Sequence, residues 1–374
     1  MARIAIFCDG TWNSPNTDPP THVHALHALA ANNDEQAARY ILGVGAKERD
    51  GSWTAHLRHK FGGGIFGHGL NDNIKSAYKA LAERYKPGDK IYIFGFSRGA
   101  YTARSLVGML RKCGIVENPT PERLEQAYAL YRLPGEGNHP DALRILGHRR
   151  ALSPHMATSQ DDLNWRMSHP VEGQPDQMQI LKIAYLGVWD TVGSLGIPAP
   201  IFGPAAKLWN RKYSFHDTQL TSMVKSARHA LALDERRVFY KPSIWDNIDQ
   251  TVENEGLNKG DRTPLRPYQE VWFTGSHSIV GGSSNSRALS EVTREWVADG
   301  ARLAGLDVAA GPVDPGARDI LERPTFIYRV AGNWLKWRPG PGHPIELHET
   351  VSKRVKDQPG YRPKSLRKLL PELF

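Results

Sequence analysis

Residues 90–104 read KIYIFGFSRGAYTAR, and this stretch decides the fold that we expect for the chain. Residues 90–94 are a short apolar run, a Gly-x-Ser-x-Gly turn follows at 95–99, and small residues open a helix from residue 100 onwards. A strand, a sharp turn with a serine and a helix make up a nucleophile elbow, in which flanking glycines relieve crowding around the serine. The stretch predicts Ser97 as a nucleophile; the alternative is a tight turn with an incidental serine.

Apolar runs on both sides of this stretch alternate with helix-like segments. Strands are predicted at 4–8, 39–44, 90–94, 180–188 and 270–273. Helices are predicted at 22–38, 70–85, 100–112, 218–233 and 290–304, and a long loop at 48–69. The alternation predicts an α/β fold of the α/β-hydrolase type, with a mostly parallel central sheet, helices on both faces and a helical insertion.

A chain of 374 residues favours one large catalytic domain with an insertion. We expect this domain to cover residues 1–310, with the proline-rich residues 311–374 as a C-terminal segment packed on it. Residues 115–180 show weak periodicity and several prolines, and we expect them to form a largely helical lid that shapes the acyl pocket.

A serine hydroxyl is a poor nucleophile at neutral pH, so it needs a base and an acid that orients the base. In α/β-hydrolases the chain order is Ser, then Asp or Glu, then His. Asp190 and His277 each follow a predicted strand, and the carboxyl ends of parallel strands meet at one edge of the sheet. Ser97, Asp190 and His277 are therefore the predicted catalytic residues. The structural alternatives are a turn residue or helix cap at Asp190 and a loop histidine at 277.

Other histidines are weaker candidates for the base. His229 lies in an apolar, helix-like stretch and reads as a buried structural histidine, while His343 and His348 lie in the C-terminal segment. His22, His24 and His27 lack Asp, Glu or Cys ligands at matching spacing, so we interpret them as surface histidines rather than a metal site.

The oxyanion hole is expected to combine two backbone N–H groups. One belongs to Arg98, directly after the nucleophile, and the other to Thr11 in the loop after the first strand. Gly10 lets the backbone of that loop approach closely, although an ordinary Asp-Gly turn is the alternative.

The composition restricts partners and location. The net charge is +9, but the basic residues are scattered, which predicts a solvated basic surface, no nucleic-acid binding and at most transient contact with a membrane surface. Cys8 and Cys113 belong to no CxxC or His-rich cluster, and we expect no metal and no organic cofactor. No apolar run has the length of a signal-peptide core or a transmembrane helix, so we expect a cytoplasmic location, with export by a specialised system left open.

Five segments carry a family resemblance: FCDGTWN at 7–13, GFSRGAYTAR at 95–104, GVWDTVG at 187–193, HALALDER at 229–236, and VWF leading to His277 at 271–277. In this order they resemble the DUF2235 family, also described as the phospholipase catalytic domain of type VI secretion lipase effectors. The resemblance runs from residue 3 to at least 285. It implies an α/β-hydrolase fold with Ser97 as nucleophile, Asp190 as acid and His277 as base.

One departure from the family matters for the site. The family's histidine segment commonly reads HSDVGGG, whereas residues 277–283 read HSIVGGS. Ile279 replaces an acidic residue, so a hydrogen bond or ion held there is lost or moved.

These features predict a serine hydrolase that cleaves a small-molecule or lipid carboxylic ester through an acyl-enzyme, as an esterase or lipase does. One alternative is a phospholipase effector that acts on membrane lipids. Another is a non-catalytic binding protein with a hydrolase fold, which Ile279 favours. The oligomeric state stays open.

Overall fold

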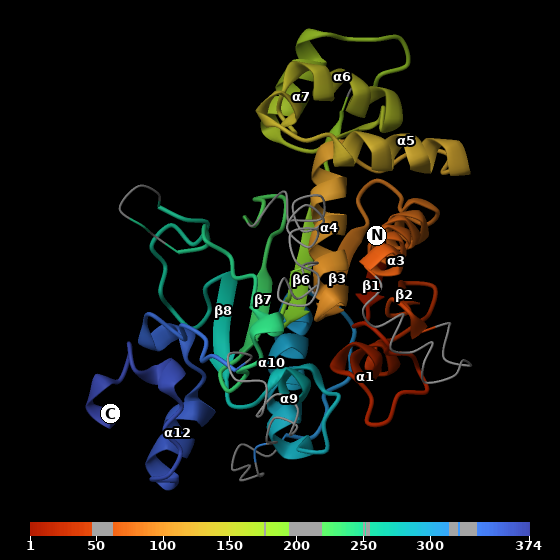
Figure 1. Cartoon of the computed structure of the whole chain (residues 1–374). Helices are drawn as coiled ribbons and strands as arrows, with labels where there is room; N and C mark the ends of the chain where they lie inside the picture. The colour runs from red at the N-terminus through yellow and green to blue at the C-terminus, as the bar shows by residue number, and fades with distance from the viewer. Residues whose placement is uncertain are drawn as a thin grey trace.

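The structure is a computed structural model that describes residues 1–46, 63–175, 177–193, 219–249, 251, 255–313, 321 and 335–374. Its centre is a six-stranded sheet in the order β2-β1-β3-β6-β7-β8, in which every pairing is parallel (Figure 1). The strands are β1 (Arg3–Cys8), β2 (Gln36–Ile41), β3 (Lys90–Phe96), β6 (Ile183–Trp189), β7 (Ala227–Ala232) and β8 (Tyr268–Phe273). The predicted α/β class with a mostly parallel sheet is confirmed.

Helices cover both faces of this sheet because its strands alternate between two apolar cores. In β1, Ile4 and Ile6 pack with α3 (Gly63–Ala82) and α4 (Arg98–Cys113), while Phe7 packs with α1 (His22–Leu29) and α10 (Arg287–Leu303) on the other face. Successive side chains of a strand point to opposite faces, so a strand buried on both faces reads as an uninterrupted apolar run. The short helix α9 (His277–Gly281) follows β8.

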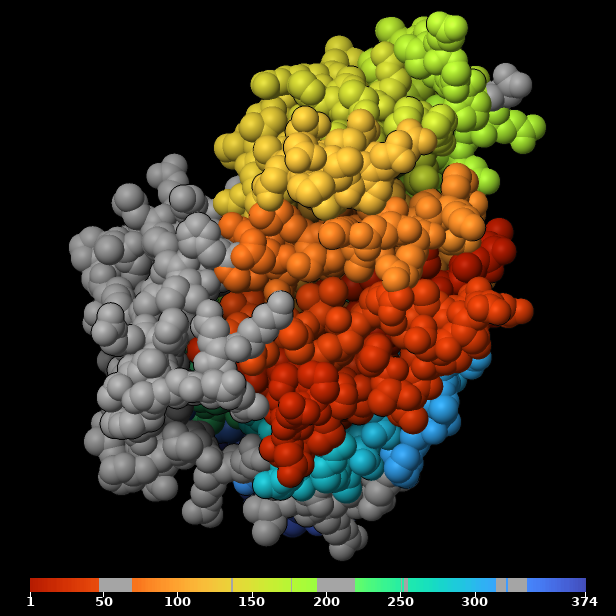
Figure 2. Space-filling view, turned by 90° about the vertical axis from the view of Figure 1, so that its right-hand side faces the viewer, coloured from red at the N-terminus to blue at the C-terminus, as the bar shows by residue number. Residues whose placement is uncertain are grey.

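The insertion lies at the far end of α4 from Ser97. It contains α5 (Pro121–Arg132), α6 (Leu143–Leu152) and α7 (Gln160–Ser168), with the small parallel pair β4 (Met156–Ala157) and β5 (Gln179–Ile180). These helices stand above the rest of the molecule in Figures 1 and 2.

A lid role for residues 115–180 does not fit this position. Arg149 of α6 donates to the carbonyl of Arg111, 3.1 Å away in the last turn of α4. Ser97 caps the opposite end of this 16-residue helix, which at 1.5 Å per residue is about 24 Å long. The insertion is helical, as expected, but it packs near the amino ends of the strands instead of over the serine.

The C-terminal residues pack on one edge of the sheet. Val351 of α12 (Glu349–Asp357) and Leu366 form a buried cluster with Leu231 of β7 and Trp272 of β8. The described 3-10 helices are η2 (Glu136–Asn138), η3 (Val238–Tyr240), η4 (Pro344–Glu346), η5 (Lys364–Leu366) and η6 (Pro371–Leu373).

The helix predicted over 218–233 is wrong, because residues 227–232 form strand β7. Alanine and leucine favour helices, yet all six residues are buried between β6 and β8. Burial on both faces of the sheet outweighs a propensity of a few tenths of a kcal/mol per residue. A segment of six residues is also short for a helix, whereas it is an ordinary length for a strand.

Further boundaries differ from the prediction, among them those of α1 and α3. The helix predicted over 22–38 ends at Leu29, since the Asn33 side chain accepts the N–H groups of Glu35 and Gln36 in a turn before β2. Helix α3 already begins at Gly63, inside the predicted loop 48–69, of which residues 48–62 lie outside the described part of the chain.

Candidate active site

Ser97 occupies a strained turn between β3 and α4. Its φ is +57°, a region that non-glycine residues rarely adopt, and its N–H donates to the carbonyl of Trp189 at 3.0 Å. A Cβ at Gly95 would lie 2.5 Å from the carbonyl oxygen of Gly99, and a Cβ at Gly99 would lie 2.2 Å from that of Cys8. Both glycines of the Gly-x-Ser-x-Gly turn are therefore required by close backbone approach.

The structure brings Ser97, His277 and Asp190 into one hydrogen-bonded chain. Ser97 Oγ lies 2.8 Å from His277 Nε2, and His277 Nδ1 lies 2.5 Å from Asp190 Oδ2. The three residues are 5%, 4% and 0% exposed, and each follows a parallel strand at the carboxyl edge of the sheet. With Nδ1–H donated to the carboxylate, Nε2 is left to accept the serine proton.

Two aromatic rings pack against the His277 ring. The centroid distances are 4.7 Å to Phe96 and 4.6 Å to Tyr240. Burial lowers the pKa of His277 below its ordinary value of 6.5, and the hydrogen bond that His277 donates to Asp190 opposes this shift only in part. The imidazole is therefore neutral near pH 7, which is the protonation state that a general base requires.

Asp190 is buried but remains charged. Burial alone would raise the pKa of its carboxyl, but the Arg338 guanidinium and the hydrogen bond from His277 outweigh burial and hold the pKa well below its usual range. Oδ1 also accepts the N–H of Ala232 at 2.9 Å, and the φ of Asp190 is +40°. Sequence reasoning missed Arg338, because this arginine belongs to no recognisable motif in the proline-rich C-terminal segment.

A carboxylate from a different segment stands beside His277. Glu235, which is 2% exposed, accepts the backbone N–H of His277 at 3.1 Å and pairs with Arg237 at 2.7 Å. Ile279 is fully buried, and a Cβ at Gly275 would lie 2.5 Å from its Cγ2. Ile279 is thus a buried apolar residue packed against Gly275, while the acidic group next to the histidine comes from the loop after β7.

The loop that carries Thr11 touches the first turn of α4. Its anchor is Asp9, whose carboxylate accepts the Thr21 hydroxyl at 2.7 Å and also the Tyr40 hydroxyl. A Cβ at Gly99 would lie 2.4 Å from the Asp9 carbonyl oxygen, so this loop and the Arg98 turn are in direct contact. Their N–H groups remain our predicted oxyanion hole.

The rival histidines have structural partners. His229 lies on β7, where Nε2 accepts the N–H of Thr191 at 3.1 Å and Nδ1 faces Glu270 at 2.8 Å, so it is a buried structural histidine as expected. His343 and His348 cap the N-termini of η4 and α12. His22 is fully buried against Ser290, which corrects its interpretation as a surface histidine.

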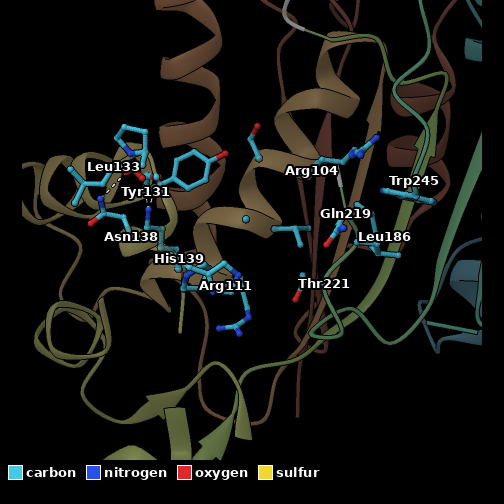
Figure 3. A pocket seen from close by; sticks show the side chains of 18 residues that line it. Arg104, Arg111, Tyr131, Leu133, Asn138, His139, Leu186, Gln219, Thr221 and Trp245 are labelled. Carbon is cyan, nitrogen blue, oxygen red and sulfur yellow. Dashed lines mark hydrogen bonds between the residues drawn. The ribbon is translucent and has the colours of Figure 1, made fainter. Parts of the chain in front are cut away.

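A cavity of about 570 Å³ lies along the later turns of α4, between Trp245 and the insertion (Figure 3). Its basic side chains already bond to the protein. Arg104 donates to the Ser243 carbonyl, Arg111 pairs with Asp141, and Lys112 donates to the Leu133 carbonyl. The cavity is separate from the Ser97 turn.

The described residues contain no cluster of three or more His, Cys, Asp or Glu side chains that could hold a metal ion. Within the same residues, no helix is both long and apolar enough to cross a bilayer.

A parallel sheet with a serine on a strained strand–helix turn defines an α/β protein of hydrolase-like architecture. The chain belongs to the family described as T6SS, Phospholipase effector Tle1-like, catalytic domain, which matches residues 2–300. This match confirms the resemblance found in the sequence.

A curated relative is the uncharacterized protein YEL023C of Saccharomyces cerevisiae, 30% identical over 248 residues, which are 64% of this chain and 32% of the yeast protein. Among solved structures, the Tle1 effector bound to the VgrG spike from the Type 6 secretion system matches with a TM-score of 0.35 and 17% identity, over 75% of this chain and 51% of that chain. An uncharacterized protein from Pseudomonas aeruginosa matches with a TM-score of 0.43 and 14% identity, over 100% of this chain and 52% of that chain. The chain thus spans about a third to a half of the length of these proteins.

Proposed function

We propose that the protein is a serine hydrolase that cleaves carboxylic esters of lipids through an acyl-enzyme, with Ser97 as nucleophile, His277 as base and Asp190 as the acid. The observation that carries the proposal is the continuous hydrogen-bonded path from Ser97 Oγ through the His277 ring to Asp190. Membership of a phospholipase effector family favours a lipid over another ester as the substrate.

The reaction starts when Ser97 Oγ attacks the ester carbonyl while His277 Nε2 takes the hydroxyl proton. The negative charge on the carbonyl oxygen is stabilised by the N–H groups of Arg98 and Thr11. The protonated His277 then gives its proton to the leaving alcohol, which leaves the acyl group on Ser97. A water molecule, deprotonated by His277, releases the acid. Asp190 stabilises the imidazolium in both halves of the reaction.

The test is hydrolysis of p-nitrophenyl esters of increasing acyl length, followed by liposomes of phosphatidylethanolamine and phosphatidylglycerol. We expect fatty-acid release by the wild type and its loss in both S97A and H277A. S105A is a matched control, because Ser105 is a buried serine on the same helix that lies outside the Ser97–His277–Asp190 path. Ester turnover that survives in S97A would contradict the assignment of the nucleophile.

The second candidate is a phospholipase effector that acts on membranes, which the family description and the net charge of +9 favour. Release that increases with anionic lipid and falls with salt would support it. Equal rates on soluble esters and on liposomes of every composition would favour a general esterase instead. A non-catalytic binding protein predicts no turnover of any ester by the wild type.

A further inference from the structure

Asp190 has a second buried partner besides His277, and this partner holds both of its carboxylate oxygens. Arg338 Nη1 lies 2.6 Å from Oδ1, and Nη2 lies 2.9 Å from Oδ2. The arginine is 7% exposed, so the pair is shielded from water and salt. A bidentate arginine fixes the plane of a carboxylate as well as its charge.

The guanidinium is itself held in place by the protein backbone. Nη1 donates to the carbonyl of Ala232 at 2.9 Å, and Nη2 donates to the carbonyl of Tyr240 at 2.5 Å. These carbonyls flank the site, because Ala232 also donates its N–H to Asp190 and the Tyr240 ring packs on His277. Arg338 therefore connects Asp190 after β6, Ala232 at the end of β7 and Tyr240 of η3, which surround the imidazole.

Arg338 lies outside the part of the chain that matches the family, which ends at residue 300. It belongs to the C-terminal residues 335–374, which pack on β7 and β8 through Val351 and Leu366. Leu335 also pairs with Arg237 in an isolated antiparallel bridge, three residues before Arg338. A segment beyond the family-matched region thus supplies a buried charge to the proposed acid.

We propose that Arg338 is a positioning residue of the active site, which orients the Asp190 carboxylate toward His277 and keeps it ionised. The proposal rests on the proposed function, since it assigns Arg338 a role through Asp190. Without the guanidinium, a fully buried carboxylate at a positive φ would retain the Ala232 N–H and the imidazole as partners. Such a carboxylate takes up a proton more readily, and a protonated Asp190 no longer stabilises the imidazolium.

The test compares R338M and R338K with the wild type by the pH dependence of ester turnover. We expect R338M to lower kcat by about 10- to 100-fold, the effect typical of removing the outer partner of a metal ligand, with little change in KM. The acid limb of the R338M profile should move to higher pH. R338K should recover part of kcat, because lysine keeps the positive charge but has only one nitrogen to contact the carboxylate.

R266M is a matched control. Arg266 is another buried arginine that ties the C-terminal segment to the rest of the chain, through the Ile345 carbonyl at 3.1 Å, and it does not contact Asp190. We expect R266M to lower the thermal stability without moving the pH profile. An R338M variant that folds and keeps the kcat and pH profile of the wild type would overturn the proposal. If R338M fails to fold, R338K decides: an unchanged kcat and profile would also overturn it.

A second measurement separates this proposal from the proposed function. In S97A, the proton between His277 and Asp190 should give a downfield resonance in ¹H NMR spectra, and adding R338K should cause its loss at a higher pH than in S97A alone. A resonance that is unaffected by R338K overturns the role of Arg338, whether or not the wild type hydrolyses esters. If the wild type hydrolyses no ester while R338K does move the loss of the resonance to higher pH, the proposed function fails and the positioning contact stands.

Discussion

His277 Nδ1 and Asp190 Oδ2 lie 2.5 Å apart, although 87 positions of the chain separate the two residues. The parallel sheet makes this contact possible, because β6 delivers Asp190 and β8 delivers His277 to the same edge, with only β7 between them. In the proposed mechanism, this carboxylate stabilises the imidazolium that forms during turnover, so the contact bears directly on the rate.

Asp190→Asn should lower kcat by about 10³- to 10⁴-fold with a small change in KM, because an amide cannot stabilise the imidazolium and favours the wrong tautomer. D249N serves as the control, since Asp249 accepts a hydrogen bond from Asn258 and has no contact with His277. Steady-state kinetics on a soluble ester measure both variants. A D190N variant within tenfold of the wild type would refute the role of this carboxylate.

The pH dependence of kcat/KM should follow the neutral form of His277. Burial lowers the pKa of His277 below 6.5, so the base stays neutral and active at a pH where an exposed histidine is already protonated. We expect the acid limb of the profile to have its midpoint below pH 6.5. A midpoint above this value would show that the imidazole does not have the buried environment described for it.

Gly99→Ala should damage both folding and turnover. The new Cβ would lie 2.2 Å from the Cys8 carbonyl and 2.4 Å from the Asp9 carbonyl, and neither backbone group can move without opening the contact between the β1 loop and α4. We expect a loss of about 1–3 kcal/mol in the free energy of unfolding and a lower kcat. Gly147→Ala is the control, because Gly147 lies in α6 with no neighbour within 4 Å, and alanine should stabilise that helix by up to about 1 kcal/mol. Equal stability of the two variants, measured by urea unfolding, would contradict the close contact.

His348 should make the fold sensitive to acid. Burial lowers its pKa to about 4 in the folded state, compared with 6.5 for an ordinary histidine. Between these values the unfolded chain takes up a proton that the folded chain does not, so stability is lost as the pH falls from about 6.5 to about 4.

His348→Asn keeps a residue that caps helices well but removes the titrating group from the N-cap of α12. Its stability relative to the wild type should therefore rise as the pH falls through this window. Urea unfolding at pH 7, 5.5 and 4.5 measures the difference, and a difference that does not change with pH would disprove the assignment.

The parts of the site that sequence could reveal are those with a local signature. Ser97 follows an apolar run, lies between two glycines and precedes small residues. Each of these features is explained by interactions within about ten residues of the serine, so the sequence alone can reveal it. Asp190 and His277 could be selected because both follow apolar runs within a few residues, and parallel strands share a carboxyl edge. The class of the fold follows from the same runs.

Other features depend on contacts between residues that lie far apart in the sequence, and no local pattern indicates such contacts. Residues 227–232 have helix-forming side chains, and only burial between β6 and β8 makes them a strand. The position of the insertion depends on the direction of α4, which leads away from the carboxyl edge. Arg338 has no motif, and its role depends on a contact with Asp190 across 148 positions.

The most direct test of the central claim is covalent labelling by a fluorophosphonate, followed by mass spectrometry of the peptide that contains residue 97. A fluorophosphonate reacts with a serine that a neighbouring base has activated, so we expect one phosphonate adduct, located on Ser97. The adduct should be absent in S97A, strongly reduced in H277A and retained in S105A. A folded wild-type protein that remains unlabelled, or one labelled at another serine, would contradict this account.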